Sequence, residues 1–439
     1  MNAATLDLAP YWMPFTHNRY FKQRPKLVAS GEGAYLTLTD GRRVFDCLSG
    51  LWCTPLGHSH PKIVAAVQKQ VAKLDYSPGF QVSHPGAFEL AARIARWAPP
   101  GLNRVFFANS GSESVDTALK IAVAYHRIRG AEKRTRIIGR EKGYHGVGIG
   151  GTSVGGIPNN RAMFTGLMVP NVDHLPHTYN PAEMRFTKGQ PAWGAHLADE
   201  LETLVERHGA DTIAAVIVEP MQGSAGVIVP PRGYLERLRK ICTQHGILLI
   251  FDEVITGFGR VGANFGAQRL GVTPDLITFA KAVTNGVVPF GGVIARQEIH
   301  DAFMTGPPHA IELFHGYTYS GHPLACAAGN ATLEAMEEMG AVARSAELET
   351  VLEEAIHSLR GEPKVADIRN FGLAAAVELT PREGKPGLRA LEAFERGLDA
   401  GLLLRFTGDT LAVAPPFIAT PEEIRDMAQT LRGVLHGIE

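Results

Sequence analysis

The sequence predicts an α/β protein whose mainly parallel sheet is covered by helices on both faces. Short apolar runs rich in Val, Ile, Leu and Phe recur through the middle of the chain. Segments with helical periodicity lie between several of these runs, and a glycine follows each of those helices. Strands that are buried on both faces give continuous apolar runs rather than alternating ones. The alternation of strands and helices is typical of a doubly covered parallel sheet.

The first predicted elements are two strands near the N-terminus, at residues 34–38 and 43–46. Residues 61–74 predict a helix, because a proline opens the segment and its apolar side chains recur on one face. Residues 104–108 (RVFFA) predict a short strand. A turn and a helix at residues 114–129 follow this strand, and a glycine marks the end of the helix.

The middle of the chain is expected to continue this pattern. Helices are expected at residues 197–208 and 234–245, each followed by a glycine. The glycine-rich stretch 143–156 predicts a loop beside a site rather than a linker. The further strands expected here are residues 136–139, 213–218, 247–251, 276–279 and 292–295.

After about residue 330 the pattern changes to that of a smaller α+β unit. Two helical stretches precede strands at residues 365–369 and 373–379, a hairpin-like segment at 402–413 and a final helix from Pro421. The N-terminal strands are expected to join this unit. We therefore predict a small domain built from both chain ends around a large domain, with limits at residues 1–60, 61–330 and 331–439.

Composition excludes several classes of function. The 43 basic and 44 acidic residues nearly cancel, so neither nucleic-acid binding nor attraction to a membrane surface is supported. No apolar run approaches the roughly 20 residues that cross a bilayer. Residues 1–12 lack the basic start and apolar core of a secretory signal, so we expect a cytoplasmic protein. The four cysteines show no C-x-x-C pair and no zinc spacing, which predicts reduced thiols and no metal site.

Two charged residues follow apolar runs in a way that suggests catalysis. Residues 247–253 (ILLIFDE) end in acids that include Asp252, and Lys281 follows the run that ends at Phe279. A carboxylate and an amine at strand ends suit pyridoxal phosphate, which needs an acid beside its ring nitrogen and a lysine to hold its aldehyde. Taken alone, the aspartate could cap a helix and the lysine could lie on the surface. Together with a phosphate site upstream, the pair favours catalysis.

The candidate phosphate site is the segment 109–113 (NSGSE), between a predicted strand and its helix. Gly111 allows close approach, the free amides of a helix N-terminus attract an anion, and Ser112 adds a hydroxyl donor. An ordinary turn with serine caps is the alternative. Tyr144 could stack on a flat ring or be merely a packed tyrosine. Glu219 follows a strand at the carboxyl edge of the sheet, where ligands of such sheets bind.

Two other motifs are interpreted as chance matches. Residues 257–262 fit G-x-G-x-x-G, but residues 252–256 separate them from their strand, whereas a dinucleotide site begins at the strand end. Residues 151–155 fit the G-x-S-x-G motif of hydrolases, but we expect neither the strand nor the helix that this motif requires.

Taken together, these residues resemble the fold-type I, class III (subgroup II) aminotransferases. The resemblance is closest to the ω-amino acid:pyruvate, or β-alanine:pyruvate, aminotransferases and covers nearly the whole chain. Its most specific part is the arrangement D-E-V, G-R-x-G and P-D-x₅-K, which spans residues 252–281. The segments 50–52 (GLW) and 315–320 (HGYTYS) narrow the resemblance further.

The resemblance implies a large domain with a mainly parallel sheet of the seven-stranded type, a smaller α+β domain, and pyridoxal phosphate as cofactor. It also implies a homodimer, or a tetramer of two dimers, with the active site at the subunit interface. Lys281 would bind the aldehyde and move the proton. The remaining roles implied are Asp252 at the ring nitrogen, Gly111, Ser112 and the neighbouring subunit's Thr318 at the phosphate, Tyr144 and Val254 on the two ring faces, and Glu219 supporting the site near Asp252.

The substrate side is also implied by the resemblance. Arg405, in an apolar stretch, would bind a substrate carboxylate and swing aside for amines without one, while Trp52 and Phe80 would line the pocket. Plain core packing is the alternative for Trp52. Ala412 stands where β-alanine enzymes of this family typically carry a glutamine, which weakens the case for β-alanine as preferred donor.

The expected activity is transfer of an amino group from β-alanine, another ω-amino acid or an amine to pyruvate. The products would be L-alanine and an aldehyde or ketone, by ping-pong kinetics. One alternative is a class III enzyme of other specificity, such as a 4-aminobutyrate or diamine transaminase. Another, of a different class, is a nicotinamide-dependent oxidoreductase that uses residues 257–262.

Overall fold

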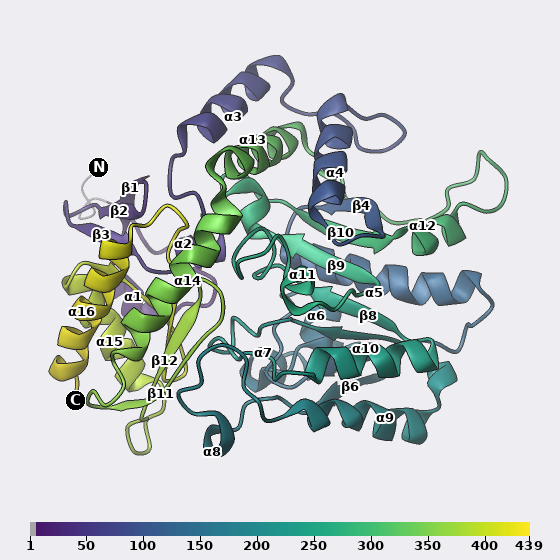
Figure 1. The fold of residues 1–439 in the computed structure, drawn as a ribbon. Coiled ribbons are helices and arrows are strands. Elements are labelled where there is room, and N and C mark those ends of the chain that lie inside the picture. The colour runs from purple at the N-terminus through teal and green to yellow at the C-terminus, as the bar shows by residue number, and fades with distance from the viewer. Residues whose placement is uncertain (1–5) are drawn as a thin grey trace.

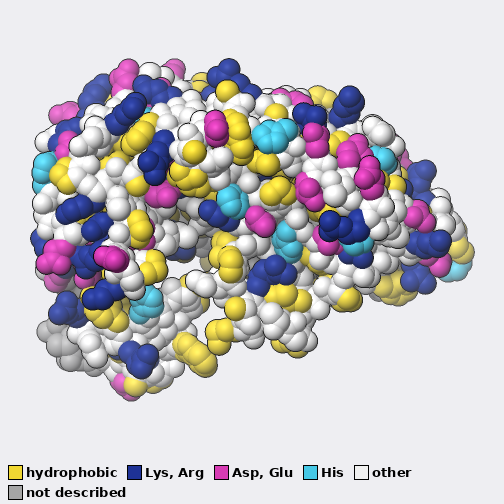
Figure 2. Space-filling view, turned by 90° about the horizontal axis from the view of Figure 1, so that it is seen from below, with side chains coloured by type: hydrophobic (Ala, Val, Ile, Leu, Met, Phe, Trp, Pro, Cys, Tyr) yellow, Lys and Arg dark blue, Asp and Glu magenta, His cyan; other side chains and the backbone are white. Residues whose placement is uncertain are grey.

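A computed structural model describes residues 6–439 of the chain (Figure 1). The signal-peptide prediction and the start of the predicted small domain fall partly on residues 1–5, which lie outside the described residues. Within the described part, no helix is both long enough and apolar enough to cross a membrane. Charged side chains of both signs are interspersed over the face seen from below, which is hollowed near its middle (Figure 2). That face carries no block of a single charge.

A seven-stranded sheet forms the centre of the molecule, and its prediction as mainly parallel is confirmed. The strand order is β4-β10-β9-β8-β7-β5-β6. β5 to β9 run parallel to one another, whereas β10 is antiparallel to both β4 and β9. The strands are β4 (Leu102–Ala108), β5 (Arg136–Arg140), β6 (Val172–Leu175), β7 (Ile213–Val218), β8 (Leu248–Asp252), β9 (Leu276–Ala280) and β10 (Gly291–Arg296).

Helices cover both faces of this sheet, as predicted. On one face lie α5 (Gly111–Ile128), α6 (Ile149–Val154) and α12 (Gln297–Phe303), and the core on the other side includes α4 (Pro85–Trp97), α9 (Glu200–His208), α10 (Tyr234–His245) and α13 (Pro323–Met339). Alternate residues of β7 divide between the two cores. Ala215 and Ile217 belong to the core with α5, whereas Val216 and Val218 belong to the core with α10. Because successive side chains point to opposite faces, a doubly covered strand has to be apolar throughout.

Two smaller sheets bring the chain ends together. Their orders are β1-β2-β3-β13 and β11-β12-β15-β14. β13 (Leu402–Leu403) pairs parallel with β3 (Arg43–Asp46), so only β14 and β15 form the hairpin expected at residues 402–413. The domain limits at residues 60 and 330 stay predictions, and the second falls inside α13. The other strands are β1 (Val28–Glu32), β2 (Tyr35–Leu38), β11 (Val365–Asn370), β12 (Ala375–Leu379), β14 (Arg405–Thr407) and β15 (Thr410–Val413).

Several elements differ from the sequence expectations. The stretch 143–156, expected to be a loop, contains helix α6, and the carboxylate of Asp116 accepts a hydrogen bond from its Gly151 amide (2.8 Å). Helix α5 begins at Gly111 rather than at residue 114, because Ser110 caps it. Strand β6 and helix α4 were not expected at all. The remaining helices are α1 (Asn18–Gln23), α2 (Ser49–Trp52), α3 (Pro61–Lys73), α7 (Pro158–Ala162), α8 (Pro181–Met184), α11 (Gly266–Leu270), α14 (Ala341–His357), α15 (Leu388–Asp399) and α16 (Pro421–Gly437).

The guanidinium of Arg260 joins the large sheet to both chain ends. Its side chain is only 2% exposed. It donates to the carbonyl oxygens of Leu373 (3.1 Å) and Pro415 (2.8 Å) and to Ser49 Oγ (3.0 Å). The same group lies 4.7 Å from the ring centroid of Phe417. One buried cation therefore satisfies acceptors from three distant parts of the chain.

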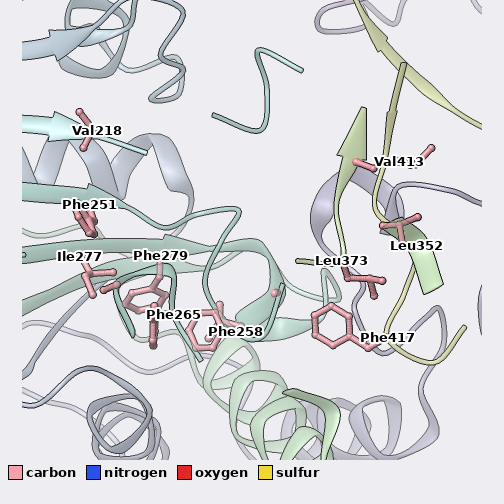
Figure 3. Packing of buried hydrophobic residues seen from close by; sticks show 14 of the residues in the cluster. Val218, Phe251, Phe258, Phe265, Ile277, Phe279, Leu352, Leu373, Val413 and Phe417 are labelled. Atoms are coloured by element: carbon pink, nitrogen blue, oxygen red, sulfur yellow. The ribbon is translucent and has the colours of Figure 1, made fainter. Parts of the chain in front are cut away.

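An aromatic layer continues across the same junction. The ring of Phe258 lies 5.1 Å from that of Phe265 and 5.8 Å from that of Phe279, measured between centroids. Figure 3 shows Phe258 between these two residues and Phe417 of the C-terminal part. The large sheet and the unit built from the chain ends thus share one hydrophobic core.

We expect replacement of Arg260 by leucine to destabilise the protein strongly. The change leaves three buried acceptors without a donor, at a cost of roughly 3 kcal/mol. The matched control is Arg42→Leu, whose ion pairs with Asp40 and Asp399 are exposed and worth less than about 1 kcal/mol. Guanidinium chloride unfolding followed by circular dichroism measures both midpoints. Equal shifts in the two variants would contradict the role given to Arg260.

Candidate active site

All the sequence-predicted cofactor residues except Thr318 line one cavity at the carboxyl edge of the large sheet. Strands β5, β7, β8 and β9 end at this edge, and helix α5 begins there. Parallel strands place their carboxyl ends together, so residues far apart in the sequence converge. The cavity is lined by Gly111, Ser112, Tyr144, His145, Gly146, Glu219, Asp252, Val254, Ile255 and Lys281.

Asp252 is the last residue of β8, and its carboxylate is fully engaged. One oxygen, Oδ1, accepts hydrogen bonds from Thr278 Oγ1 (3.0 Å) and the amide of Val254 (3.2 Å). The other, Oδ2, lies 2.7 Å from Nδ1 of His145. The carboxylate is only 5% exposed. A buried charge needs such partners, and together they fix the orientation of this side chain.

His145 is a site residue to which the sequence analysis assigned no role. Its imidazole is 1% exposed and lies between two carboxylates, with Nε2 3.8 Å from Glu219 Oε2. Burial opposes the charged imidazolium, but the carboxylates of Glu219 and Asp252 outweigh it and raise the pKa of His145. The signal that could have found it is its position next to Tyr144, in a segment already singled out.

Glu219 supports the segment that carries the tyrosine. Its Oε1 accepts a hydrogen bond from the amide of Tyr144 (2.9 Å). Its backbone oxygen accepts one from Arg140 Nη2 (2.7 Å), and the Arg140 guanidinium also lies 3.7 Å from Glu219 Oε2. A chain of charged contacts therefore leads from Arg140 to Glu219, from Glu219 to His145, and from His145 to Asp252. Charges of opposite sign therefore alternate behind the cavity.

The N-terminus of α5 contributes a compact cup to the lining of the cavity. Gly111 and Ser112 occupy its first turn, where backbone amides have no partner within the helix. Ser112 Oγ accepts a hydrogen bond from the amide of Val147 (3.0 Å). A Cβ on Gly146 would meet Ser112 Oγ at 2.4 Å, and one on Gly111 would meet Val254 Cγ1 at 3.1 Å. Gly146, which also has a left-handed φ of 86°, is therefore required by close packing, whereas a side chain at Gly111 would press on Val254.

Lys281 enters the cavity from a strained turn. It follows β9 directly, begins the 3-10 turn η5 (Lys281–Thr284) and has a left-handed φ of 53°. Residues with side chains adopt this conformation rarely, and such strain clusters at functional sites. No hydrogen bond or ion pair engages its Nζ among residues 6–439. Burial lowers the pKa of Lys281, the Asp252 carboxylate opposes this shift, and the Arg405 guanidinium adds to it.

The four remaining predicted residues do not line this cavity. Trp52 is buried in a separate hydrophobic cluster against which Ile255 packs, and Ile255 does line the cavity. Arg405 lies exposed on β14, close enough for its charge to act on Lys281 and Tyr144. Thr318 and Phe80 are exposed, and Phe80 lies against Gly316, two residues before Thr318, since a Cβ on Gly316 would meet the Phe80 ring at 2.9 Å.

In both motifs that were interpreted as chance matches, side chains have structural roles. In the segment 257–262, the side chains of Phe258 and Arg260 are buried. Ser153, in the G-x-S-x-G match, lies near the C-terminal end of the short helix α6, and no helix begins at this serine as the hydrolase motif requires. Its Oγ donates to the Ile149 carbonyl oxygen (2.6 Å) and accepts from the Val169 amide (2.8 Å). All four cysteines are free.

Comparison with known proteins agrees with this geometry. The family model Aminotransferase class-III matches residues 18–435. An omega-aminotransferase of Caulobacter vibrioides is 57% identical over 433 residues, which cover 99% of this chain and 98% of the relative. A beta-alanine–pyruvate aminotransferase of Pseudomonas aeruginosa is 53% identical over 439 residues, covering 99% and 97%.

A solved structure extends the comparison. It is an amine transaminase from an uncultivated Pseudomonas species in its PLP-bound, internal aldimine form. It matches with a TM-score of 0.91 and 35% identity over 98% of this chain and 99% of that chain. The chain therefore belongs to the class-III family of pyridoxal phosphate-dependent aminotransferases.

Proposed function

We propose that this protein moves an amino group from an ω-amino acid or a simple amine to pyruvate, with pyridoxal phosphate as cofactor. One observation carries the proposal. The amine of Lys281 and the carboxylate of Asp252 line the same cavity, which is also lined by Gly111 and Ser112 at the N-terminus of α5. One relative named above is a beta-alanine–pyruvate aminotransferase, and two further relatives are named omega-amino acid–pyruvate and putrescine–pyruvate aminotransferase.

The residues present fit the cofactor. The cup of Gly111 and Ser112 leaves the first amides of a helix without a partner within the helix, and such amides would bind the phosphate. Asp252, whose side chain is oriented by its hydrogen bonds to Thr278 and Val254, would pair with a protonated ring nitrogen. Tyr144 and Val254 would lie on the two faces of the ring. Glu219 would act through the Tyr144 amide and His145 rather than on the cofactor itself.

Bound pyridoxal phosphate supplies an electron-accepting ring that stabilises negative charge on the substrate carbon. Lys281 would carry the cofactor and, once displaced by substrate, move a proton to or from that carbon. A base must be neutral when it accepts a proton, and burial lowers the pKa of Lys281 toward that state. The raised pKa of His145 favours an imidazolium beside Asp252, which stabilises the negative charge of that carboxylate.

A homodimer is proposed as the minimal active unit. Thr318 is exposed and does not line the cavity of its own chain. This is expected of a residue that binds the phosphate in the neighbouring subunit's site. Phe80 packs beside Gly316 and would therefore reach the same neighbouring site. Exposed apolar side chains accompany them, including Phe314 (88% exposed) and Val82 (59% exposed). Pairing of dimers into tetramers and a cytoplasmic location stay predictions from the sequence.

Donor choice is proposed to depend on Arg405 and its strand partner. Arg405 pairs directly with Ala412 across β14 and β15. No hydrogen bond or ion pair engages the guanidinium among residues 6–439, so it is free to bind a carboxylate or to turn away. An alanine beside it offers no amide to hold it in one position. We therefore favour a donor range that includes simple amines as well as ω-amino acids, with Trp52 lining the pocket.

In the cofactor-free protein, Lys281 should react with an amine-selective acylating reagent at lower pH than an exposed lysine. Burial disfavours the ammonium, so the neutral amine appears below the ordinary pKa of 10.5. Mass spectrometry of peptides gives the labelling rate of Lys281 and of exposed Lys73 as a function of pH. If the labelling rate of Lys281 reached its midpoint at the same pH as that of Lys73, or at a higher pH, the proposed role of Lys281 as base would be contradicted.

Lys281→Ala should abolish transamination while leaving the fold intact. General acid–base groups contribute roughly 10²–10⁴-fold, and this lysine would serve both as base and as cofactor anchor. Alanine formation from pyruvate is the assay, circular dichroism checks the fold, and Lys73→Ala is the matched control. Activity of the Lys281 variant close to that of the wild type would contradict the proposed role of Lys281.

Arg405→Ala should impair β-alanine as donor more than isopropylamine, which has no carboxylate. Loss of a charge-assisted hydrogen bond predicts a decrease of about 10- to 100-fold in kcat/KM for β-alanine. Ala412→Gln is the complementary variant, because an amide beside Arg405 should raise the preference for β-alanine. An equal loss on both donors in the Arg405 variant would count against a carboxylate site.

A further inference from the structure

Two strained segments of backbone meet beside the active-site lysine. The turn η5 is bracketed by Lys281 and Asn285, with φ values of 53° and 50°. The facing segment 49–53 includes Ser49 with φ of 49° and Trp52 with φ of 67°. Bulky residues are true outliers in this region, and such strain persists only where the surroundings enforce it.

The shape of the segment 49–53 is enforced by a buried carboxylate. Asp46 is fully buried, and its Oδ2 accepts from the amide of Gly50 (2.5 Å) and lies 2.7 Å from His58 Nε2. Its Oδ1 accepts from the amide of Leu48 (3.2 Å). Ser49 Oγ donates to a carbonyl oxygen of the C-terminal part (2.7 Å). The segment therefore keeps its conformation without help from the lysine turn.

Backbone hydrogen bonds anchor the same region to the C-terminal part of the chain. The amide of Ala414 donates to Cys47 O (2.6 Å), and the amide of Phe417 donates to Pro55 O (2.7 Å). These bonds set the place of residues 47–55 relative to the smaller unit. These bonds do not set the distance between residues 47–55 and the turn that carries Lys281.

The side chain of Asn285 supplies that connection. Its Oδ1 accepts from the amide of Leu56 (2.9 Å), and its Nδ2 donates to Gly57 O (2.8 Å). The residue is only 1% exposed. Beside it, a Cβ on Gly286 would meet Cys53 Cβ at 3.0 Å, so the two segments are in contact. Asparagine suits the position because it tolerates the left-handed conformation and offers both a donor and an acceptor.

We propose that Asn285 is a positioning residue that fixes the Trp52 segment relative to Lys281 and thereby sets the size of donor that the site accepts. The inference rests on the proposed role of Trp52 in lining the substrate pocket. Asn285 touches neither substrate nor cofactor in this account. It acts through the segment 53–57, which leads back to Trp52.

The test is Asn285→Gly in the holoenzyme, because glycine keeps the left-handed backbone and removes both hydrogen bonds. The readout is the ratio of kcat/KM for two amines without a carboxylate that the wild type accepts, such as isopropylamine and 1-phenylethylamine. Small misplacements at an active site cost up to about 100-fold, so we expect the ratio to change by about tenfold or more. Visible absorption of bound pyridoxal phosphate should keep its wild-type stoichiometry.

Three further variants make the result decisive. Asn285→Asp keeps the acceptor for Leu56 and should give an intermediate ratio, and it serves if the glycine variant does not fold. Asn370→Ala removes an equally buried amide with two hydrogen bonds in β11, far along the chain. This control should lower thermal stability and leave the donor ratio unchanged. Trp52→Ala is the positive control, because it shows how far the donor ratio shifts when the pocket itself is changed.

The outcomes separate the inference from the proposed function. A shifted ratio in the Trp52 and Asn285 variants, but not in the Asn370 variant, supports the inference. An unchanged ratio in both Asn285 variants, with a shift in Trp52→Ala, overturns the inference alone. An unchanged ratio in Trp52→Ala overturns the pocket role of Trp52 and the inference with it. An equal shift in Asn370→Ala would mean that Asn285 only stabilises the fold.

Discussion

Burial of the Asp252 carboxylate at the end of β8 is the constraint on which the rest of the site depends. A buried charge has to be paired, and the pairing extends outward from this one residue. His145 meets Asp252 at 2.7 Å, Glu219 lies beside His145, and the Tyr144 amide donates to Glu219. The segment that carries the tyrosine is therefore placed by electrostatics rather than by apolar packing. The seven-stranded sheet contributes the common edge at which these groups meet.

The opposite side of the site is held by strain. Lys281 and Trp52 both have left-handed backbones, and both lie on segments that buried polar side chains hold in place. Such conformations cost free energy and persist only in rigid surroundings. Arg260 provides part of that rigidity, because its guanidinium reaches both Ser49 and the C-terminal part. The two sides of the site are thus fixed differently: paired charges hold the side of Asp252 and Tyr144, and strained backbone marks the side of Lys281 and Trp52.

The sequence predicted the large sheet well because its strands are continuously apolar, and it singled out Lys281 and Asp252, which line one cavity, because a charge stands at the end of such a run. It failed at β6, where Asp173 and His174 interrupt the apolar pattern of an edge strand. It failed at α6, because a glycine-rich stretch has low helix propensity and the helix there depends on the Asp116 carboxylate. His145 and Asn285 were assigned no role, because their effect depends on contacts with residues more than 100 positions away. Pairing partners of this kind cannot be read from local pattern.

The most direct test of the account is the visible absorption of the purified protein supplied with pyridoxal phosphate, followed by an amine donor and then pyruvate. The account predicts a visible band of bound cofactor that bleaches with β-alanine or a simple amine and returns with pyruvate. Absence of any such band, or a band that no amine bleaches, would contradict the claim that Lys281 and Asp252 form an aminotransferase site.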